Sequence, residues 1–443
     1  MQADCLGKGE ANNILFFILT MATIREREQS RRKAGRKNKS KGNTRRRNQS
    51  HRRNNTSRKK GGAVIGAGAF GCVFRPPLRC PGEVDAGDGP RVTKLMSSSE
   101  ADHEYNMITK FNKTINTIPN HDSFFLTAPV SLCNVDPELI TQSDLVPAPE
   151  TEGCDITVEE LQSNPGNFKL LQLPDGGIPL RIYIEEAVSD WDEAECLQFI
   201  SHMTALLLGG IVPANEKGLY NMDVKGDNIV VDGKGRPRLI DWGTGCQTDG
   251  CVRDARLLGA PTLHTGLHAH EQYNVPCVVA MAFEKACFPK WKGGVCINEG
   301  DETGILREEW KRAMAKPNLA NIRSLVNDFI STVHGTYLLE NILNWVAPGK
   351  AYMTLFEYTI RNVKEYTDTE GNFKADQFYA NFYNNVDPWG WAMTVSMLQT
   401  GKGKSWTLSA ANMRRRVAKY LFEEGAIRID PGQLARISLD IVE

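Results

Sequence analysis

The chain lacks the features that mark a secreted or membrane-spanning protein. None of its 11 cysteines stands in a C-x2-C pair, the spacing typical of zinc ribbons and dithiol redox sites, so we expect the reduced thiols of an intracellular protein. The apolar run Asn13–Met21 is shorter than the ~20 residues that span a bilayer, and no other run approaches that length. It has neither the basic start nor the small-residue cleavage site of a signal peptide, and a translation start at Met21 would remove it. We therefore expect no membrane association.

The chain also lacks net formal charge, but this balance hides two oppositely charged parts. Residues 1–60 hold 18 Lys/Arg and 4 Asp/Glu, which leaves 35 of the 53 basic and 49 of the 53 acidic residues to the remainder. From Arg25 to Lys60 almost no residue is apolar, so this tail is predicted to be disordered.

The basic tail has several open roles. It can bind nucleic acid nonspecifically, which would weaken with salt, direct nuclear import, or dock on the acidic remainder; a solubilising arm is the plain alternative. It has no interleaved aromatic residues, which argues against recognition by base stacking.

Two patterns give weak metal signals. His264, His268 and His270 form H-x3-H-x-H, for which a polar loop is a simpler interpretation than zinc. The pair Cys246 and Cys251, five residues apart, is interpreted as incidental.

The stretch Asn221–Gly243, NMDVKGDNIVVDGKGRPRLIDWG, is the most informative part of the sequence. Lys225 follows Asp223 by two residues, Asn228 follows Asp223 by five, and Asp241 follows Asn228 by thirteen. A carboxylate base, a cation and two metal-ligand types in this order suit phosphoryl transfer from Mg-ATP, where catalysis is mostly positioning and charge neutralisation.

A glycine-rich motif lies upstream, where Gly66–Val73 reads G-x-G-x-F-G-x-V. Glycines allow a close approach of the backbone to phosphates. A dinucleotide-binding Rossmann turn is the rival, but it needs a helix after the third glycine. Here Cys72–Phe74 is followed by Arg75-Pro76-Pro77, and prolines oppose a helix. We therefore predict the turn of a β-hairpin.

A lysine and a glutamate follow between the two motifs. Arg91–Met96 is predicted to be an alternating strand that carries Lys94, and Ser97–Lys113 a helix with serine N-cap candidates. Glu104 is the predicted partner of Lys94, with Glu100 as the competitor. Alone they would be read as a surface pair; their order between the other motifs favours a functional pair.

The motifs, in this order, resemble those of the eukaryotic-type protein kinases. The blocks VIGAGAFGCVF, VTKLM, LLQLPDGG, LYNMDVKGDNIV, LIDWG, QYNVP and NVDPWGW are similar to those of the Ser/Thr protein kinases of nucleocytoplasmic large DNA viruses. The resemblance covers about residues 62–440, although 280–380 contributes little. It implies an α+β, bilobal protein-kinase-like fold: a small antiparallel β-sheet N-lobe with one helix, and a mainly α-helical C-lobe.

The implied organisation is a tail at 1–60, an N-lobe at 61–174 and a C-lobe at 175–443. A helical insertion is expected at about 280–380. Asp387–Trp391, DPWGW, looks like the start of the central C-lobe helix, and Asp387 is expected to hydrogen-bond the catalytic-loop backbone.

The resemblance implies catalytic and metal-binding roles. Asp223 would orient the substrate hydroxyl, and Lys225 would offset charge on the transferred phosphoryl group. Asn228 and Asp241 would hold Mg²⁺, with Mn²⁺ as an alternative.

It also implies a nucleotide site. Lys94, fixed by Glu104, would contact the α- and β-phosphates of ATP. The hinge is expected at Gln172–Asp175, where Leu173 would donate its N–H to adenine because Pro174 has none. The residues expected to contact the nucleotide are Ile65, Gly66, Ala67, Gly68, Phe70, Gly71, Val73, Lys94, Leu170 and Leu173, of which Leu170 would guard the back of the pocket.

Three departures from the family pattern stand out. Asn221-Met222 replaces His-Arg, so activation through a phosphorylated loop is not expected. Trp242 replaces the usual Phe and should hinder a flip of that segment. Asn274-Val275-Pro276 stands where A-P-E is usual.

The leading hypothesis is an active, viral Ser/Thr protein kinase with protein substrates, located in the host cytoplasm or nucleus or in the virion. A pseudokinase scaffold that binds nucleotide, and nucleic acid through its tail, is the first alternative. A small-molecule or lipid kinase of related fold is the second.

Overall fold

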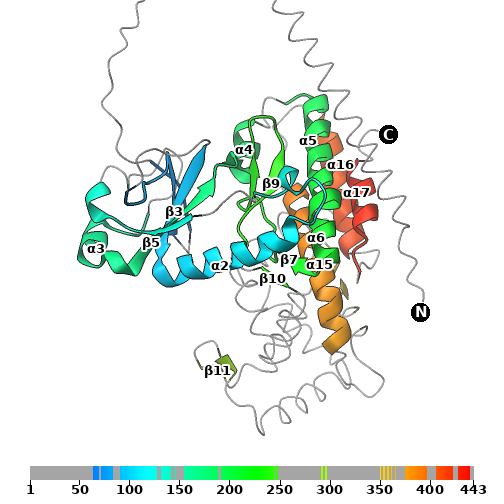
Figure 1. Ribbon diagram of the computed structural model, residues 1–443. Helices are drawn as coiled ribbons and strands as arrows, with labels where there is room; N and C mark the ends of the chain where they lie inside the picture. Colours follow the sequence, from blue (N-terminus) through cyan, green and yellow to red (C-terminus); the bar gives the residue numbers. More distant parts are fainter. Residues whose placement is uncertain are drawn as a thin grey trace, which may run out of the picture. The chain divides into compact units, whose positions relative to one another are not determined.

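The structure is a computed structural model of mixed α and β content (Figure 1). The tail at 1–60, the three histidines and most of the region 280–380 lie outside the described residues. The described residues are 63–68, 71–82, 90–126, 131–140, 145, 154–187, 191–243, 245–247, 291–292, 295–296, 350, 353–354, 357–358, 361, 365, 375–396, 406–422 and 428–439.

The chain divides into two compact units between Gly176 and Gly177. One unit holds the described residues of Phe16–Lys113 and Leu126–Gly176, and we call it the sheet unit. The other, the helical unit, holds Thr114–Phe125 and the described residues from Gly177 onward. The predicted boundary after Pro174 did not assign Thr114–Phe125 to the second part.

The sheet unit is built on an antiparallel sheet of five strands in the order β1-β2-β3-β5-β4 (Figure 1). Helix α2 follows β3 directly, and the short helix α3 precedes β5. The elements are β1 Ala63–Gly68, β2 Gly71–Arg75, β3 Arg91–Ser97, α2 Ser98–Ile115, β4 Ser131–Asn134, α3 Val158–Ser163 and β5 Phe168–Pro174.

The glycine-rich motif forms the predicted hairpin. β1 and β2 pair antiparallel up to Gly68 and Gly71, so the third glycine begins a strand and not a helix. This excludes the Rossmann turn. Gly71 has a φ of 135°, and a Cβ there would lie 2.1 Å from the carbonyl oxygen of Leu95. Gly71 is therefore required for the approach of β2 to β3.

The two faces of this sheet carry different side chains, because side chains alternate along each strand. Lys94 on β3 is paired across the strands with Val73 and Leu171, and we call their side the Lys94 face. Leu95 is paired with Cys72 and Leu170, which define the Leu95 face. Both faces are covered, so β3 is buried from Val92 to Met96; the expected alternation of buried and exposed residues was wrong.

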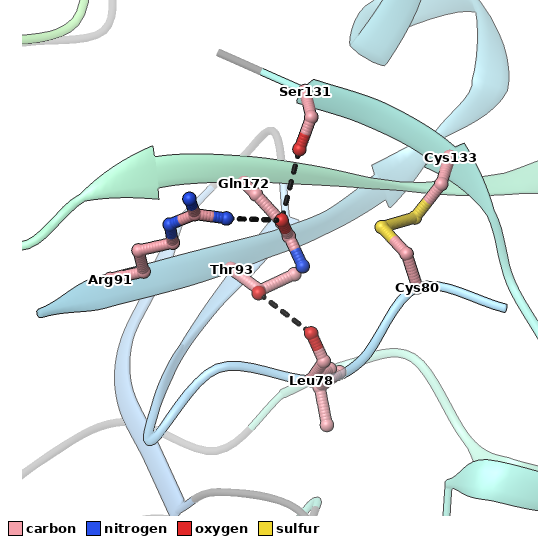
Figure 2. Close-up of a disulfide and its surroundings, with 7 residues drawn as sticks. All are labelled: Leu78, Cys80, Arg91, Thr93, Ser131, Cys133 and Gln172. Atoms are coloured by element: carbon pink, nitrogen blue, oxygen red, sulfur yellow. Dashed lines mark hydrogen bonds between the residues drawn. A yellow bond between two sulfur atoms is a disulfide. The ribbon is translucent and has the colours of Figure 1, made fainter. Parts of the chain in front are cut away.

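Two disulfides cover the Leu95 face. Cys72 of β2 is bonded to Cys154, before α3, and Cys80, after β2, is bonded to Cys133 of β4 (Figure 2). Cys246 is disulfide-bonded as well. The expectation of reduced thiols was wrong for these five cysteines, because the fold brings together residues that are 82 and 53 positions apart in the sequence; the buried Cys196 is a free thiol.

Helices α5, α15, α16 and α17 pack together in the helical unit, and a three-stranded sheet of order β6-β8-β9 lies beside them (Figure 1). β7 pairs with β10 in a separate two-stranded sheet, and β11 pairs with β12. The elements are β6 Ile178–Pro179, α4 Leu180–Ala187, α5 Glu193–Leu206, η5 Leu207–Ile211, α6 Val212–Glu216, β7 Leu219–Tyr220, β8 Ile229–Val231, β9 Pro237–Leu239, β10 Cys246–Gln247, β11 Trp291–Lys292, β12 Val295–Cys296, α15 Ala375–Ser396, α16 Trp406–Phe422 and α17 Pro431–Leu439.

The continuous helix Glu193–Glu216 is long and apolar enough to cross a membrane, contrary to the expectation that no such run exists. Most of that apolar stretch is buried inside the unit. A capping box at Asp192 and Glu195 fixes its start. The burial is that of a core helix.

Helix α15 begins at Ala375, twelve residues before the predicted start at Asp387. Asp387 and Trp391 are buried within it, and the indole Nε1–H of Trp391 donates to the carbonyl oxygen of Met203 at 2.7 Å. Gly390 lies against the loop that contains Val224, where a Cβ would stand 2.4 Å from the Val224 carbonyl oxygen. The glycine thus sets how closely α15 approaches this loop.

Candidate active site

In the sheet unit, Lys94 and Glu104 form a buried ion pair. The Lys94 Nζ donates to Oε2 of Glu104 at 2.6 Å, as the sequence predicted. Glu100 is not the partner in this pair; its backbone N–H donates to the Ser97 hydroxyl at 3.3 Å, in the first turn of α2. Loss of one member of a buried pair leaves an uncompensated charge, at a cost of about 3–5 kcal/mol.

The register of β5 corrects the predicted residue at the back of the nucleotide site. Leu170 lies on the Leu95 face, in the cluster of Val64, Phe74 and Leu95. The fully buried neighbour on the same face as Lys94 is Leu171. Leu171 is identified by its pairing with Lys94 across the two strands. The sequence alone does not supply that pairing.

The register also changes the expectation for Leu173. The Asp175 N–H donates to the Pro90 carbonyl oxygen at 2.9 Å. Hydrogen-bonded and non-hydrogen-bonded pairs alternate along an antiparallel ladder. Arg91 and Pro174 therefore form a non-hydrogen-bonded pair, and Val92 and Leu173 form the next hydrogen-bonded pair. The Leu173 N–H therefore points toward β3, and the predicted donation to adenine does not fit.

In the helical unit, Asp223 is the centre of a cluster of polar side chains. Its Oδ2 lies 3.1 Å from the Lys225 Nζ and accepts a hydrogen bond from the Asn228 amide at 2.6 Å. The same amide nitrogen donates to the Asp223 backbone carbonyl at 3.0 Å. The structure thus brings together three of the predicted site residues.

Asp387 holds the backbone of this loop. Its two carboxylate oxygens accept from the N–H groups of Asn221, at 2.9 Å, and Met222, at 2.8 Å. The predicted hydrogen bonds of Asp387 to the backbone of this loop are confirmed. Burial raises the pKa of Asp387 to about 7, while the two N–H groups oppose that rise.

Asn221 joins the loop to the segment of Asp241. It is fully buried, its side-chain oxygen accepts from the Asp223 N–H at 3.1 Å, and its side-chain nitrogen donates to the Asp241 carbonyl oxygen at 2.8 Å. The sequence presented Asn221 only as a departure from the family pattern. Its side chain connects the proposed base to the proposed metal ligand.

Two non-glycine residues of the site lie in the left-handed region, Met222 with a φ of 64° and Asp241 with a φ of 58°. Such backbone conformations are uncommon and cluster at functional sites. Next to Asp241, the indole of Trp242 is buried and its ring centroid lies 5.7 Å from that of Phe125. This packing fixes the segment after Asp241.

The charge state of Asp223 is sensitive to its surroundings. Its pKa is raised to about 7, mainly by burial, and the nearby Asp241 carboxylate contributes to this rise. Lys225 and the Asn228 amide oppose the rise. The carboxylate therefore changes charge near neutral pH, which suits a group that accepts a proton.

The donor set fits magnesium. The Asn228 amide nitrogen faces Asp223, so its oxygen points away from that carboxylate. The N–H of Ile240 donates to the backbone carbonyl of Asn228 at 2.9 Å. Asp241 follows Ile240 directly and therefore lies beside Asn228. Within the described residues no three His, Cys, Asp or Glu side chains gather into a metal site. Mg²⁺ needs only one or two protein carboxylates or amides, with waters and substrate phosphates.

No protein-family model matches this chain, and no curated protein matches its sequence.

Proposed function

We propose that the chain is a protein kinase that transfers the γ-phosphoryl group of Mg-ATP to Ser or Thr hydroxyls of proteins. The arrangement around Asp223 carries this proposal: a buried carboxylate with a pKa near 7, in contact with a lysine ammonium and an amide that also suits a metal ion. The reaction needs this combination because it depends on positioning and charge neutralisation.

In this proposal Asp223 accepts the hydrogen bond of the substrate hydroxyl and takes its proton. Lys225 neutralises charge on the phosphoryl group as it moves. Asn228 and Asp241 would hold Mg²⁺, which would supply positive charge to offset the charge of the phosphate groups.

The sheet unit supplies the remaining groups. Lys94, fixed by Glu104, binds the α- and β-phosphates, and the hairpin of β1 and β2 covers them. Leu171, and not Leu170, stands at the back of the adenine site. The sheet unit and the helical unit are then the N-lobe and C-lobe of a bilobal kinase fold, as the resemblance to viral kinases implied.

The proposal includes a mode of regulation. Met222 carries no charge and cannot pair with a phosphorylated loop. The loop is instead held by Asp387 and Asn221. Activity is therefore independent of activation-loop phosphorylation.

Phosphate transfer tests the proposal directly. We expect purified protein with γ-labelled Mg-ATP to label Ser or Thr in a basic or an acidic model protein. Asp223→Asn, which keeps the side chain's shape, should lower transfer by at least ~10²-fold, the scale of a general base. Equal labelling of the model protein by the wild type and by Asp223→Asn would reject the assignment.

A further inference from the structure

The turn between Lys225 and Asn228 carries a proposed functional group at each end. The Asn228 N–H donates to the Lys225 carbonyl oxygen at 3.0 Å, so the four residues close a tight turn. Gly226 and Asp227 are its middle residues. Any shift of these two moves the lysine relative to the metal ligand.

Both middle residues contact Arg181, near the start of α4. The Arg181 backbone N–H donates to the Gly226 carbonyl oxygen at 3.3 Å, and its side-chain Nε–H donates to Oδ1 of Asp227 at 3.0 Å. The Asp227 hydrogen bond is the largest cause of a raised pKa of the Arg181 guanidinium. One residue therefore holds the backbone of the first position and the side chain of the second.

Arg181 is itself fixed to the strand that leaves the turn. β6 ends at Pro179, two residues before it, and Pro179 is paired with Val230 of β8. β8 begins directly after Asn228. Arg181 and the turn are thus both adjacent to β8, and Arg181 contacts the two middle residues of the turn.

We propose that Arg181 is a positioning residue that fixes Lys225 and Asn228 relative to Asp223. The inference rests on the proposed function, since it adds to that site a residue that holds Lys225 and Asn228 in place. The Arg181 and Asp227 side chains are about half exposed, and such pairs contribute little to folding. The effect on the site is therefore modest, about threefold to fivefold.

The test compares Arg181→Met, which keeps the aliphatic stem, with Asp227→Ala and the double variant. We expect Arg181→Met to raise by threefold to fivefold the Mg²⁺ concentration that half-saturates binding of a non-hydrolysable ATP analogue, measured by calorimetry. Its kcat should fall by a similar factor, and the double variant should lose no more, because both changes break one contact. Glu185→Gln is the matched control, since Glu185 pairs with Arg181 at 3.3 Å but not with the turn.

The possible failures are distinct. If wild-type protein transfers phosphate but Arg181→Met matches it in Mg²⁺ dependence and kcat, the role of Arg181 is overturned and the kinase proposal stands. The same holds if Arg181→Met only lowers urea stability, or if Glu185→Gln has an equal effect. If wild-type protein neither binds the analogue with Mg²⁺ nor transfers phosphate, the proposed function fails and this inference fails with it.

Discussion

Asp223 is the side chain on which the proposed function depends most. Its contacts with Lys225 and Asn228 span two and five residues of sequence, so spacing alone could predict them. The roles of Asn221 and Leu171 could not be predicted in this way. They depend on Asp241, twenty residues away, and on the register between β3 and β5.

The pH dependence of transfer follows from the raised pKa of Asp223. The carboxylate must be ionised to accept a proton, so kcat/KM should rise about tenfold per pH unit below about 7 and level off above it. The same rise means that the folded state binds this proton more tightly than the unfolded chain. Asp223 therefore contributes stability that is lost as pH rises from about 4 to about 7. A kcat/KM profile that stays flat between pH 5.5 and 8 would contradict this assignment of the base.

Helix α15 supports the site because its Asp387 holds the backbone of the loop that contains Asp223. The sequence predicted that Asp387 would bind the catalytic-loop backbone, and the residue types DPWGW carried that prediction. The predicted start at Asp387 was wrong: a proline is typical of a first turn, but this helix runs through Pro388.

Gly390→Ala tests how closely α15 must approach the loop. Since the added methyl group would overlap the Val224 carbonyl, we expect a loss of about 1–3 kcal/mol in the free energy of unfolding, measured with urea, and a fall in transfer. Gly233→Ala is the control, because a Cβ there meets no atom within 4 Å. Equal stability of the two variants would show that α15 does not need this glycine.

The strands of the sheet unit are cross-linked as elements by two disulfides. We expect peptide mapping without reductant to recover Cys72 linked to Cys154 and Cys80 linked to Cys133. Reduction should lower the free energy of unfolding by about 2–4 kcal/mol per bond. The double variant Cys72→Ser/Cys154→Ser should lose one such contribution and keep the Cys80–Cys133 peptide. Recovery of all four as free thiols from unreduced protein would contradict the structure.

On the scale of the whole molecule, the sequence predicted the elements that depend on local signals but not the contacts between distant residues. The hairpin, the strand of Lys94 and the helix of Glu104 were predicted because glycine, proline and helix-cap signals are local. The disulfides, the coverage of both sheet faces and the assignment of Thr114–Phe125 to the helical unit depend on contacts between distant residues. Disulfides form in oxidising surroundings, so the intracellular location stays a prediction that must also account for them.

The central claim is the proposed transfer of the γ-phosphoryl group of ATP, for which Lys94 and Asp223 are both required. The most direct measurement compares γ-phosphoryl transfer by wild-type protein, Lys94→Met, Asp223→Asn and the double variant, with ATP binding measured beside it. We predict that each single variant loses at least ~10²-fold, that the double variant loses little more because one step is already abolished, and that Asp223→Asn still binds ATP. Wild-type transfer no greater than that of the variants would contradict the account.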